Sequence, residues 1–148
     1  MVNINHRIGI KASPEKIYQA LTTDDGLKKW WTNDISGAGV VGSTIKFRFN
    51  GGGPDFKVTK LIPNKTVCWQ HAGNMPESWM GTEISFQLET VENQTFVRFT
   101  HSNWHETTDF MAHCNTKWAV FLLSLKDALE IGKGTPFPND IQIDHSLE

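Results

Sequence analysis

Apolar residues recur every three or four positions between residues 107 and 131. They are Met111, Cys114, Trp118, Phe121, Leu122, Leu125 and Leu129. This spacing places them on one face of an α-helix. Thr107 or Thr108 supplies an N-cap, and Gly132 supplies a C-cap position. The pattern predicts a helix of about 25 residues, roughly 37 Å long, that needs a large concave partner.

Between residues 42 and 101 the apolar positions alternate with polar ones instead, as in strands with one buried face. The inward positions are Ile45, Phe47 and Phe49, then Phe56 and Val58, then Val67, Trp69 and His71, then Ile84, Phe86 and Leu88, and finally Val97, Phe99 and His101. Turn-forming segments such as NGGGPD (50–55) separate these groups. The alternation predicts an antiparallel meander.

The N-terminal part predicts a further strand followed by two short helices. Residues 3–11 alternate Ile4, His6, Ile8 and Ile10 with polar neighbours. Ser13 and Pro14 form a helix start, and Thr23 caps a second short helix. The predicted fold class is α+β: a curved antiparallel sheet of six to seven strands wrapped around the long C-terminal helix.

Length and composition predict one soluble domain. The chain has 148 residues, of which 39% are apolar and 20% charged, with a net charge of −2. The weak charge argues against nucleic acid or an anionic membrane as a partner. We expect one domain over residues 1–139, as monomer or homodimer, and a tail at 140–148 whose final Leu147 and Glu148 have the form of a cloning remnant.

The cysteine content and the start of the sequence predict a cytoplasmic protein. Cys68 and Cys114 are the only cysteines, and we expect both to be buried, reduced thiols. Residues 1–16 lack the hydrophobic run of a signal peptide, and no segment approaches the length of a membrane span.

A cavity is expected between the sheet and the helix, because one helix is narrower than a sheet of six or seven strands. Six Trp and nine Phe residues supply its walls or, alternatively, an ordinary packed core. Cavities of this kind bind small apolar ligands, and His71 and His101 could orient one by hydrogen bonding. The candidate ligand-binding residues are Trp31, Phe47, Phe49, Phe56, Trp69, His71, Phe86, Phe99, His101, Trp104, Phe110, Cys114 and Trp118.

No metal site or cofactor is expected. His101, His105, His113 and Cys114 lie close together in sequence. However, their spacing lacks the paired ligands of a structural zinc site. A cysteine on the apolar face of a helix is usually inert packing, so Cys114 is not expected to act as a nucleophile.

Catalysis in the cavity would need a converging acid–base pair. His101 with Glu77, in the loop NMPESW, or with Asp109, at the helix start, is the best pair that the sequence offers. Loop carboxylates are more often solvated, so no residue is predicted to be catalytic and the enzyme reading stays an alternative.

Five stretches of the sequence resemble a known family. They are SPEKIYQAL (13–21), GLKKWW (26–31), GPDFKVTKL (53–61), WMGTEISF (79–86) and WAVFLLSLKDALEIGKGTPF (118–137). They resemble the SRPBCC superfamily, also called START-like or birch-pollen-allergen-like, and within it the activator of heat-shock protein 90 ATPase homologue family. The resemblance implies a helix-grip fold with a deep cavity that holds hydrophobic molecules in many relatives.

The leading functional prediction is a protein that binds an aromatic or lipid-like small molecule. One alternative is a cyclase, dehydratase or hydrolase that uses the same cavity. The resemblance also implies a second alternative, a partner that stimulates a heat-shock chaperone ATPase in the stress response. We expect the N-terminal half of the long helix to face the cavity and its C-terminal half to anchor the fold.

Overall fold

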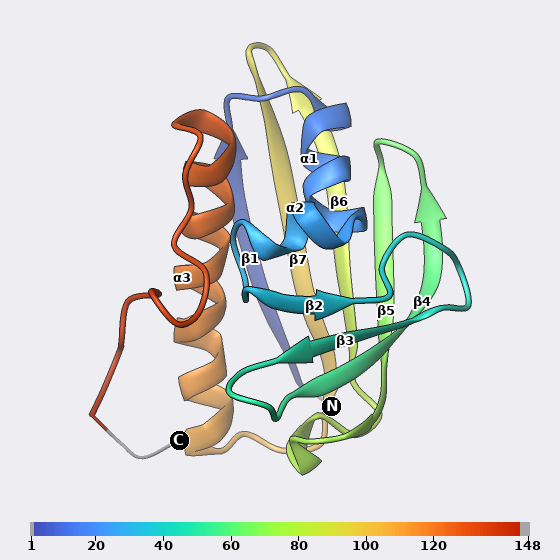
Figure 1. Cartoon of the computed structure of the whole chain (residues 1–148), viewed down its shortest axis with the longest axis vertical. Helices are drawn as coiled ribbons and strands as arrows, with labels where there is room; N and C mark the ends of the chain where they lie inside the picture. Colours follow the sequence, from blue (N-terminus) through green and yellow to red (C-terminus); the bar gives the residue numbers. More distant parts are fainter. Residues whose placement is uncertain (1, 146–148) are drawn as a thin grey trace.

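A seven-stranded antiparallel sheet forms the body of the structure (Figure 1). The computed structural model describes residues 2–145. The strands are β1 (Val2–Ile10), β2 (Asp34–Ser36), β3 (Thr44–Arg48), β4 (Pro54–Ile62), β5 (Thr66–Asn74), β6 (Glu83–Val91) and β7 (Gln94–Trp104). Their order is β1-β7-β6-β5-β4-β3-β2. The predicted meander is confirmed, and the first strand of the chain pairs with the last.

Residues 2–145 also form three α-helices and one 3-10 turn: α1 (Pro14–Thr22), α2 (Asp24–Lys28), η1 (Glu77–Trp79) and α3 (Asp109–Glu130). The predicted caps form, because the Ser13 hydroxyl accepts a bond from the Lys16 amide and the Thr108 hydroxyl accepts one from the Met111 amide. The long helix has 22 residues, slightly fewer than expected. The predicted α+β helix-grip architecture is confirmed.

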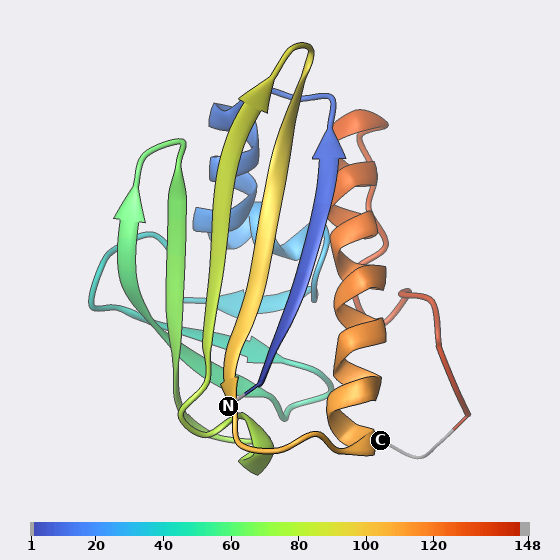
Figure 2. The same cartoon turned by 180° about the vertical axis from the view of Figure 1, so that it is seen from behind.

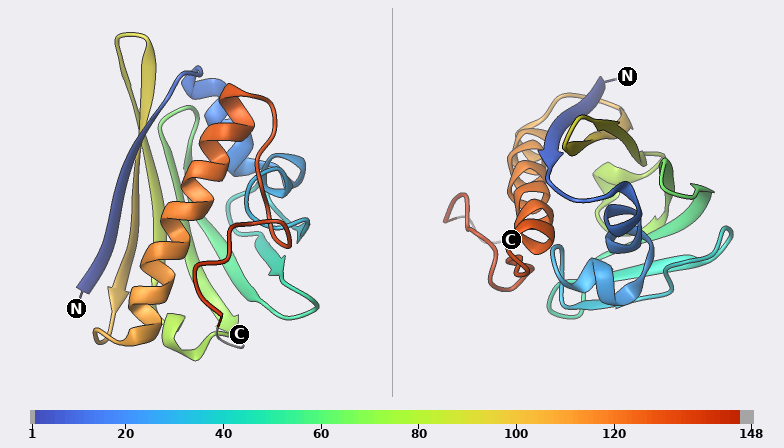
Figure 3. Two further views of the ribbon diagram at one scale, coloured as in Figure 1. Left: turned by 90° about the vertical axis from the view of Figure 1, so that its left-hand side faces the viewer. Right: turned by 90° about the horizontal axis from the view of Figure 1, so that it is seen from above.

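The sheet curves so that α3 lies along its open side. Figure 2 shows the outer face of the sheet with α3 beside β1, and the view from above in Figure 3 shows the curved sheet, α3 and the two short helices around one interior. This curvature turns the apolar face of every long strand inward, as the alternation predicted. Phe47, Phe56, Trp69, Phe86 and Phe99 are all fully buried there.

The sequence pattern did not indicate β2 or η1. Each has three residues, too few to show a period of two or of three to four. β2 is held at the sheet edge by pairing of Ile35 with Phe47 of β3. The alternation in β3 therefore specifies where β2 binds, although β2 has no pattern of its own.

After α3 the chain reverses and runs back along the helix (Figure 3, left). Gly134 makes this close approach possible, because a Cβ there would lie 2.4 Å from the Lys29 carbonyl oxygen. The Phe137 amide donates to the Trp31 carbonyl oxygen at 2.7 Å. Asp140, from the expected tail, is buried. Leu147 and Glu148, the expected cloning remnant, lie outside the described residues.

None of the helices in residues 2–145 has the length and apolar character needed to cross a membrane.

The C-terminal half of α3 is expected to anchor the fold. Leu125 is fully buried, so we predict that Leu125→Ala lowers the free energy of unfolding by about 2–5 kcal/mol through loss of apolar contacts and creation of a cavity. The measurement is urea unfolding followed by circular dichroism. Leu123→Ala is the matched control, since Leu123 lies on the same helix but is 54% exposed; equal losses in the two variants would contradict the assignment.

Candidate functional site

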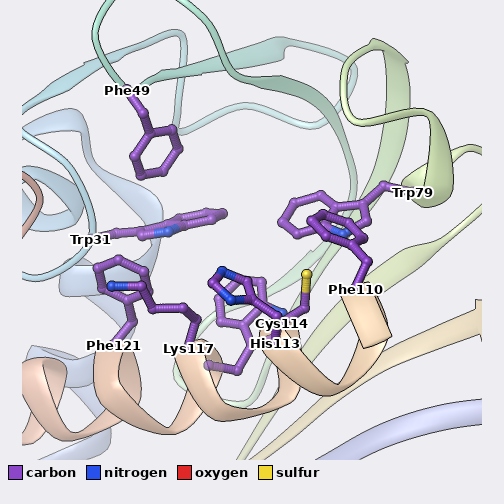
Figure 4. Close-up of a pocket in the computed structure, with 9 residues that line it drawn as sticks. Trp31, Phe49, Trp79, Phe110, His113, Cys114, Lys117 and Phe121 are labelled. Atoms are coloured by element: carbon purple, nitrogen blue, oxygen red, sulfur yellow. The ribbon is translucent and has the colours of Figure 1, made fainter. Parts of the chain in front are cut away.

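A cavity of about 160 Å³ lies between the first half of α3 and the sheet. Its lining is Trp31, Phe49, Trp79, Phe110, His113, Cys114, Lys117, Trp118 and Phe121. Figure 4 shows Trp31 and Phe49 on one side, Trp79 and Phe110 on the other, and the α3 side chains along the floor. The residues from α3 recur at positions i, i+3, i+4, i+7, i+8 and i+11 counted from Phe110, so one face of the helix supplies the whole floor. The cavity thus follows the N-terminal half of α3, as expected.

Trp31 separates the cavity from the packed core. Its ring lies 4.2 Å from that of Phe47 and stacks on Trp69 at 6.2 Å with an interplanar angle of 6°. On the cavity side it lies 4.9 Å from Trp118. Trp31 lies three residues after the end of α2, and its amide donates to the carbonyl oxygen of Leu27 in α2, so the two short helices after β1 position this wall. The cavity wall is therefore fixed by core packing.

A chain of hydrogen bonds connects two other walls. The Trp118 indole Nε1 donates to Nδ1 of His101 at 3.1 Å. An indole N–H can only donate, so the His101 proton must be on Nε2, which donates to the Thr82 hydroxyl at 3.0 Å. The Thr82 hydroxyl in turn donates to the Trp79 carbonyl oxygen at 2.6 Å. This chain joins α3 to β7 and to the segment that follows η1.

Burial keeps the His101 ring neutral. The side chain is fully buried, and desolvation, with a smaller contribution from His71, lowers the pKa of His101 to about 3. Desolvation also lowers the pKa of His71, against the opposing effect of its bond to the Met75 carbonyl oxygen. Both predicted inward histidines are therefore held in the neutral form.

Lys117 brings a charge to the edge of the cavity. Its ammonium is paired with the carboxylate of Asp140 and donates to the Ile141 carbonyl oxygen at 2.9 Å. The side chains of Lys117 and Asp140 are 16% and 2% exposed. Removing one partner of a sheltered pair of this kind is costly, because the other charge is then left without a counter-charge.

A second, outer hollow of about 610 Å³ adjoins the inner cavity. The two share Phe49, Lys117 and Phe121, and residues of the returning C-terminal segment, including Phe137 and Asp140, line the outer one. The Phe49 and Phe137 rings pack edge to face at 5.2 Å. The inner cavity therefore opens towards a larger groove that the C-terminal segment partly encloses.

The sequence profile of the family described as "Activator of Hsp90 ATPase homolog 1-like protein" (AHSA1) matches residues 11–130. This range covers more than half of the chain. The chain belongs to the AHSA1-like family. No curated protein sequence gives a match.

Solved structures share the fold of this AHSA1-like chain. Protein SSP2350 from Staphylococcus saprophyticus has a TM-score of 0.75 and 18% identity over 90% of this chain and 95% of its own. Protein MLL2253 from Mesorhizobium loti has a TM-score of 0.78 and 20% sequence identity, and the match covers 86% of this chain and 96% of MLL2253. CalU16 from Micromonospora echinospora has a TM-score of 0.78 and 16% sequence identity, and the match covers 99% of this chain and 76% of CalU16. At these identities the likeness concerns the fold alone.

The AHSA1-like structure brings together part of the predicted ligand-binding set. Trp31, Phe49, Phe110, Cys114 and Trp118 line the inner cavity. A separate surface hollow contains Trp104 in its lining. The others lie in the interior: Phe47, Phe56, Trp69, His71, Phe86, Phe99 and His101 are buried and are not in the cavity lining. Ligand contact by any of these residues stays a prediction.

Four cavity residues were not among the predicted candidates: Trp79, His113, Lys117 and Phe121. Phe121 lies on the apolar face of α3, so the helical period alone could have included it. Trp79 lies in η1, whose position relative to α3 follows only from the tertiary fold. His113 and Lys117 are polar neighbours of the apolar face, and no sequence signal distinguished them from solvated residues.

The polar residues considered for catalysis or metal binding are dispersed. Both His101 ring nitrogens are bonded to Trp118 and Thr82, and in the described part of the chain no bond joins His101 to Glu77 or Asp109. Residues 2–145 contain no cluster of three or more His, Cys, Asp or Glu side chains arranged to hold a metal ion. Cys114 is buried, as expected, whereas Cys68 is only half-buried, contrary to expectation.

The buried neutral His101 predicts acid-sensitive stability in this AHSA1-like protein. In the unfolded chain its pKa returns to about 6.5, so the unfolded state binds more protons and folding loses free energy as the pH falls from about 6.5 towards 3. The loss due to His101 is about 2 kcal/mol at pH 5. Urea unfolding at pH 7 and pH 5 measures it.

His101→Gln is the comparison for this prediction. The variant is less stable at pH 7 because its amide replaces a fitted imidazole, but its additional loss on acidification is smaller than in the wild type by about 2 kcal/mol. The difference between the two pH values removes the contribution of the other titrating groups. An unchanged pH dependence would show that His101 is not held neutral.

Proposed function

We propose that the protein binds a small hydrophobic molecule, with an aromatic ring, in the inner cavity. The observation that carries this proposal is the lining: rings from the sheet side, η1 and α3 surround a space of about 160 Å³. Aromatic walls supply dispersion and ring–ring attraction without requiring a particular polar group on the ligand. Membership of the AHSA1-like family, within a superfamily whose fold typically accommodates hydrophobic ligands, supports the same reading.

The size of the cavity supports an aromatic ligand over a large lipid. An apolar protein cavity of about 150 Å³ can hold benzene, and the inner cavity is of similar volume. A longer molecule would have to extend past Phe49 and Lys117 into the outer hollow of about 610 Å³. One ring inside and a short substituent outside fit both spaces.

The two alternative functions stay predictions. An enzyme would need an acid–base pair inside the cavity, and the best candidate, His101, has both nitrogens occupied by Trp118 and Thr82. A protein that acts on a chaperone would need an apolar or charged surface on which the chaperone docks. The family is described by its likeness to an activator of the Hsp90 ATPase, and this likeness is the reason to test that activity. An ATPase assay with a purified heat-shock chaperone would measure that activity directly.

The ligand prediction can be tested at Phe110. This side chain lines the cavity but is 39% exposed, so removing it should hardly affect folding. We predict that Phe110→Ala weakens binding of a single-ring aromatic probe by about 1 kcal/mol, or roughly five-fold in Kd, because the ligand loses one apolar wall. The change in intrinsic tryptophan fluorescence on titration measures the affinity, with toluene as probe.

Leu123→Ala provides the control, because Leu123 is exposed on α3 and does not line the cavity. It should leave the affinity unchanged. The proposal fails if aromatic probes do not bind the wild type, or if the two variants weaken binding equally.

A further inference from the structure

Lys117 lies where the inner cavity meets the outer hollow, and its side chain lines both. Figure 4 shows it beside Phe121 on the α3 side of the cavity. Its ammonium lies 5.4 Å from the centre of the Phe121 ring. A molecule with its ring in the inner cavity and a substituent in the outer hollow must therefore pass this cation.

The position for an anion beside Lys117 is filled by the chain itself. Asp140 reaches the ammonium from the C-terminal segment, and the Ile141 carbonyl oxygen accepts a second bond from it. The side chains of Lys117 and Asp140 are sheltered from solvent, where charge-assisted bonds are stronger than at an exposed surface. The structure thus contains a preformed site for one carboxylate next to an aromatic cavity.

Asp140 occupies this site incompletely. One carboxylate oxygen is paired with Lys117, whereas the other, Oδ1, is buried without a hydrogen-bond partner among the described residues. A buried oxygen in this state has lost its hydration without replacement. Displacement of Asp140 into solvent would restore that hydration, which lowers the free-energy cost of freeing Lys117.

The chain is attached differently before and after residue 139. Main-chain bonds fix the earlier part: the Phe137 amide donates to the Trp31 carbonyl oxygen, and the Phe137 carbonyl oxygen accepts from the Asn33 amide. Contacts of residues 140–145 with α3 include bonds made by the side chains of Lys117 and His113. Residues 140–145 can therefore move away from Lys117 without disturbing the Trp31 wall.

We propose that Lys117 binds the carboxylate of a single-ring aromatic acid, which takes the place of Asp140. This inference rests on the proposed function, since the ring occupies the same inner cavity. Exchange of one carboxylate for another keeps Lys117 neutralised, so a monoanion fits the site without leaving an unpaired charge. A neutral analogue gains only the apolar contacts, and a cationic analogue is repelled by Lys117.

Three matched probes test the ligand class: 3-phenylpropionate, 3-phenylpropan-1-ol and 3-phenylpropylamine, titrated at pH 7 by calorimetry. The expected result is that the acid binds at least ten-fold more tightly than the alcohol, with the amine weakest. Equal affinity for acid and alcohol, or preference for the amine, would overturn the role of Lys117 while leaving the proposed function intact. Absence of binding by all three would overturn both.

Two variants act in opposite directions. Lys117→Met keeps the apolar stem but removes the charge, and it should reduce the affinity for the acid to that for the alcohol. Asp140→Asn removes the competing charge, and it should tighten binding of the acid three- to ten-fold. The affinity of the same variant for the alcohol is the reference in each case, so that the acid-to-alcohol ratio is what is compared. If Lys117→Met does not fold, Asp140→Asn alone tests the proposal. An affinity of Asp140→Asn for the acid equal to that of the wild type would overturn it.

Matched controls separate this site from a general effect of charge. Lys126→Met removes another lysine of α3, whose ammonium pairs with Glu130. Asp127→Asn removes an exposed carboxylate of the same helix. Both should leave the affinities for acid and alcohol unchanged. A loss of acid binding in Lys126→Met equal to that in Lys117→Met would overturn the assignment to Lys117.

Discussion

The position of α3 on the sheet depends on a buried chain of hydrogen bonds from Trp118 through His101 and Thr82 to Trp79. Each member has only one consistent role: the indole donates, the neutral imidazole accepts and donates, and the hydroxyl accepts and donates. Apolar packing alone would allow α3 to slide or rotate along the sheet, because dispersion has little directional preference. The chain of hydrogen bonds fixes both the position of α3 along the sheet and its rotation, since a buried polar group left unpaired is costly.

The same chain of hydrogen bonds determines the shape of the cavity. Trp118 and Trp79 are its two ends, and their rings stack at 6.2 Å with an interplanar angle of 20°. His101 packs edge-on against Trp79 at 4.8 Å. His101 therefore shapes the cavity indirectly, by holding these rings in place, and both of its ring nitrogens are already bonded within the protein.

The fold was predictable from sequence to a greater extent than the site. Alternation in the long strands and the three-to-four spacing in α3 specify which faces are buried, and those faces determine the architecture. The same alternation cannot separate core from cavity: Phe49 and Phe86 have equivalent inward positions, yet only Phe49 lines the space. The difference arises from what lies opposite each ring, which is a property of the tertiary structure. Lys117 depends on Asp140, 23 residues further on, and no local pattern connects them.

The position of Trp31 determines which wall of the cavity can change in sequence. Its ring belongs to the core stack with Trp69, and its main chain holds Phe137, so replacement would disturb the interior and the C-terminal segment together. Phe110 and His113, on the opposite wall, are more exposed and belong to a helix that is anchored elsewhere, at Leu125. Evolution or engineering can therefore reshape the helical wall while the sheet side stays constant, and the cavity can change its shape without refolding of the core.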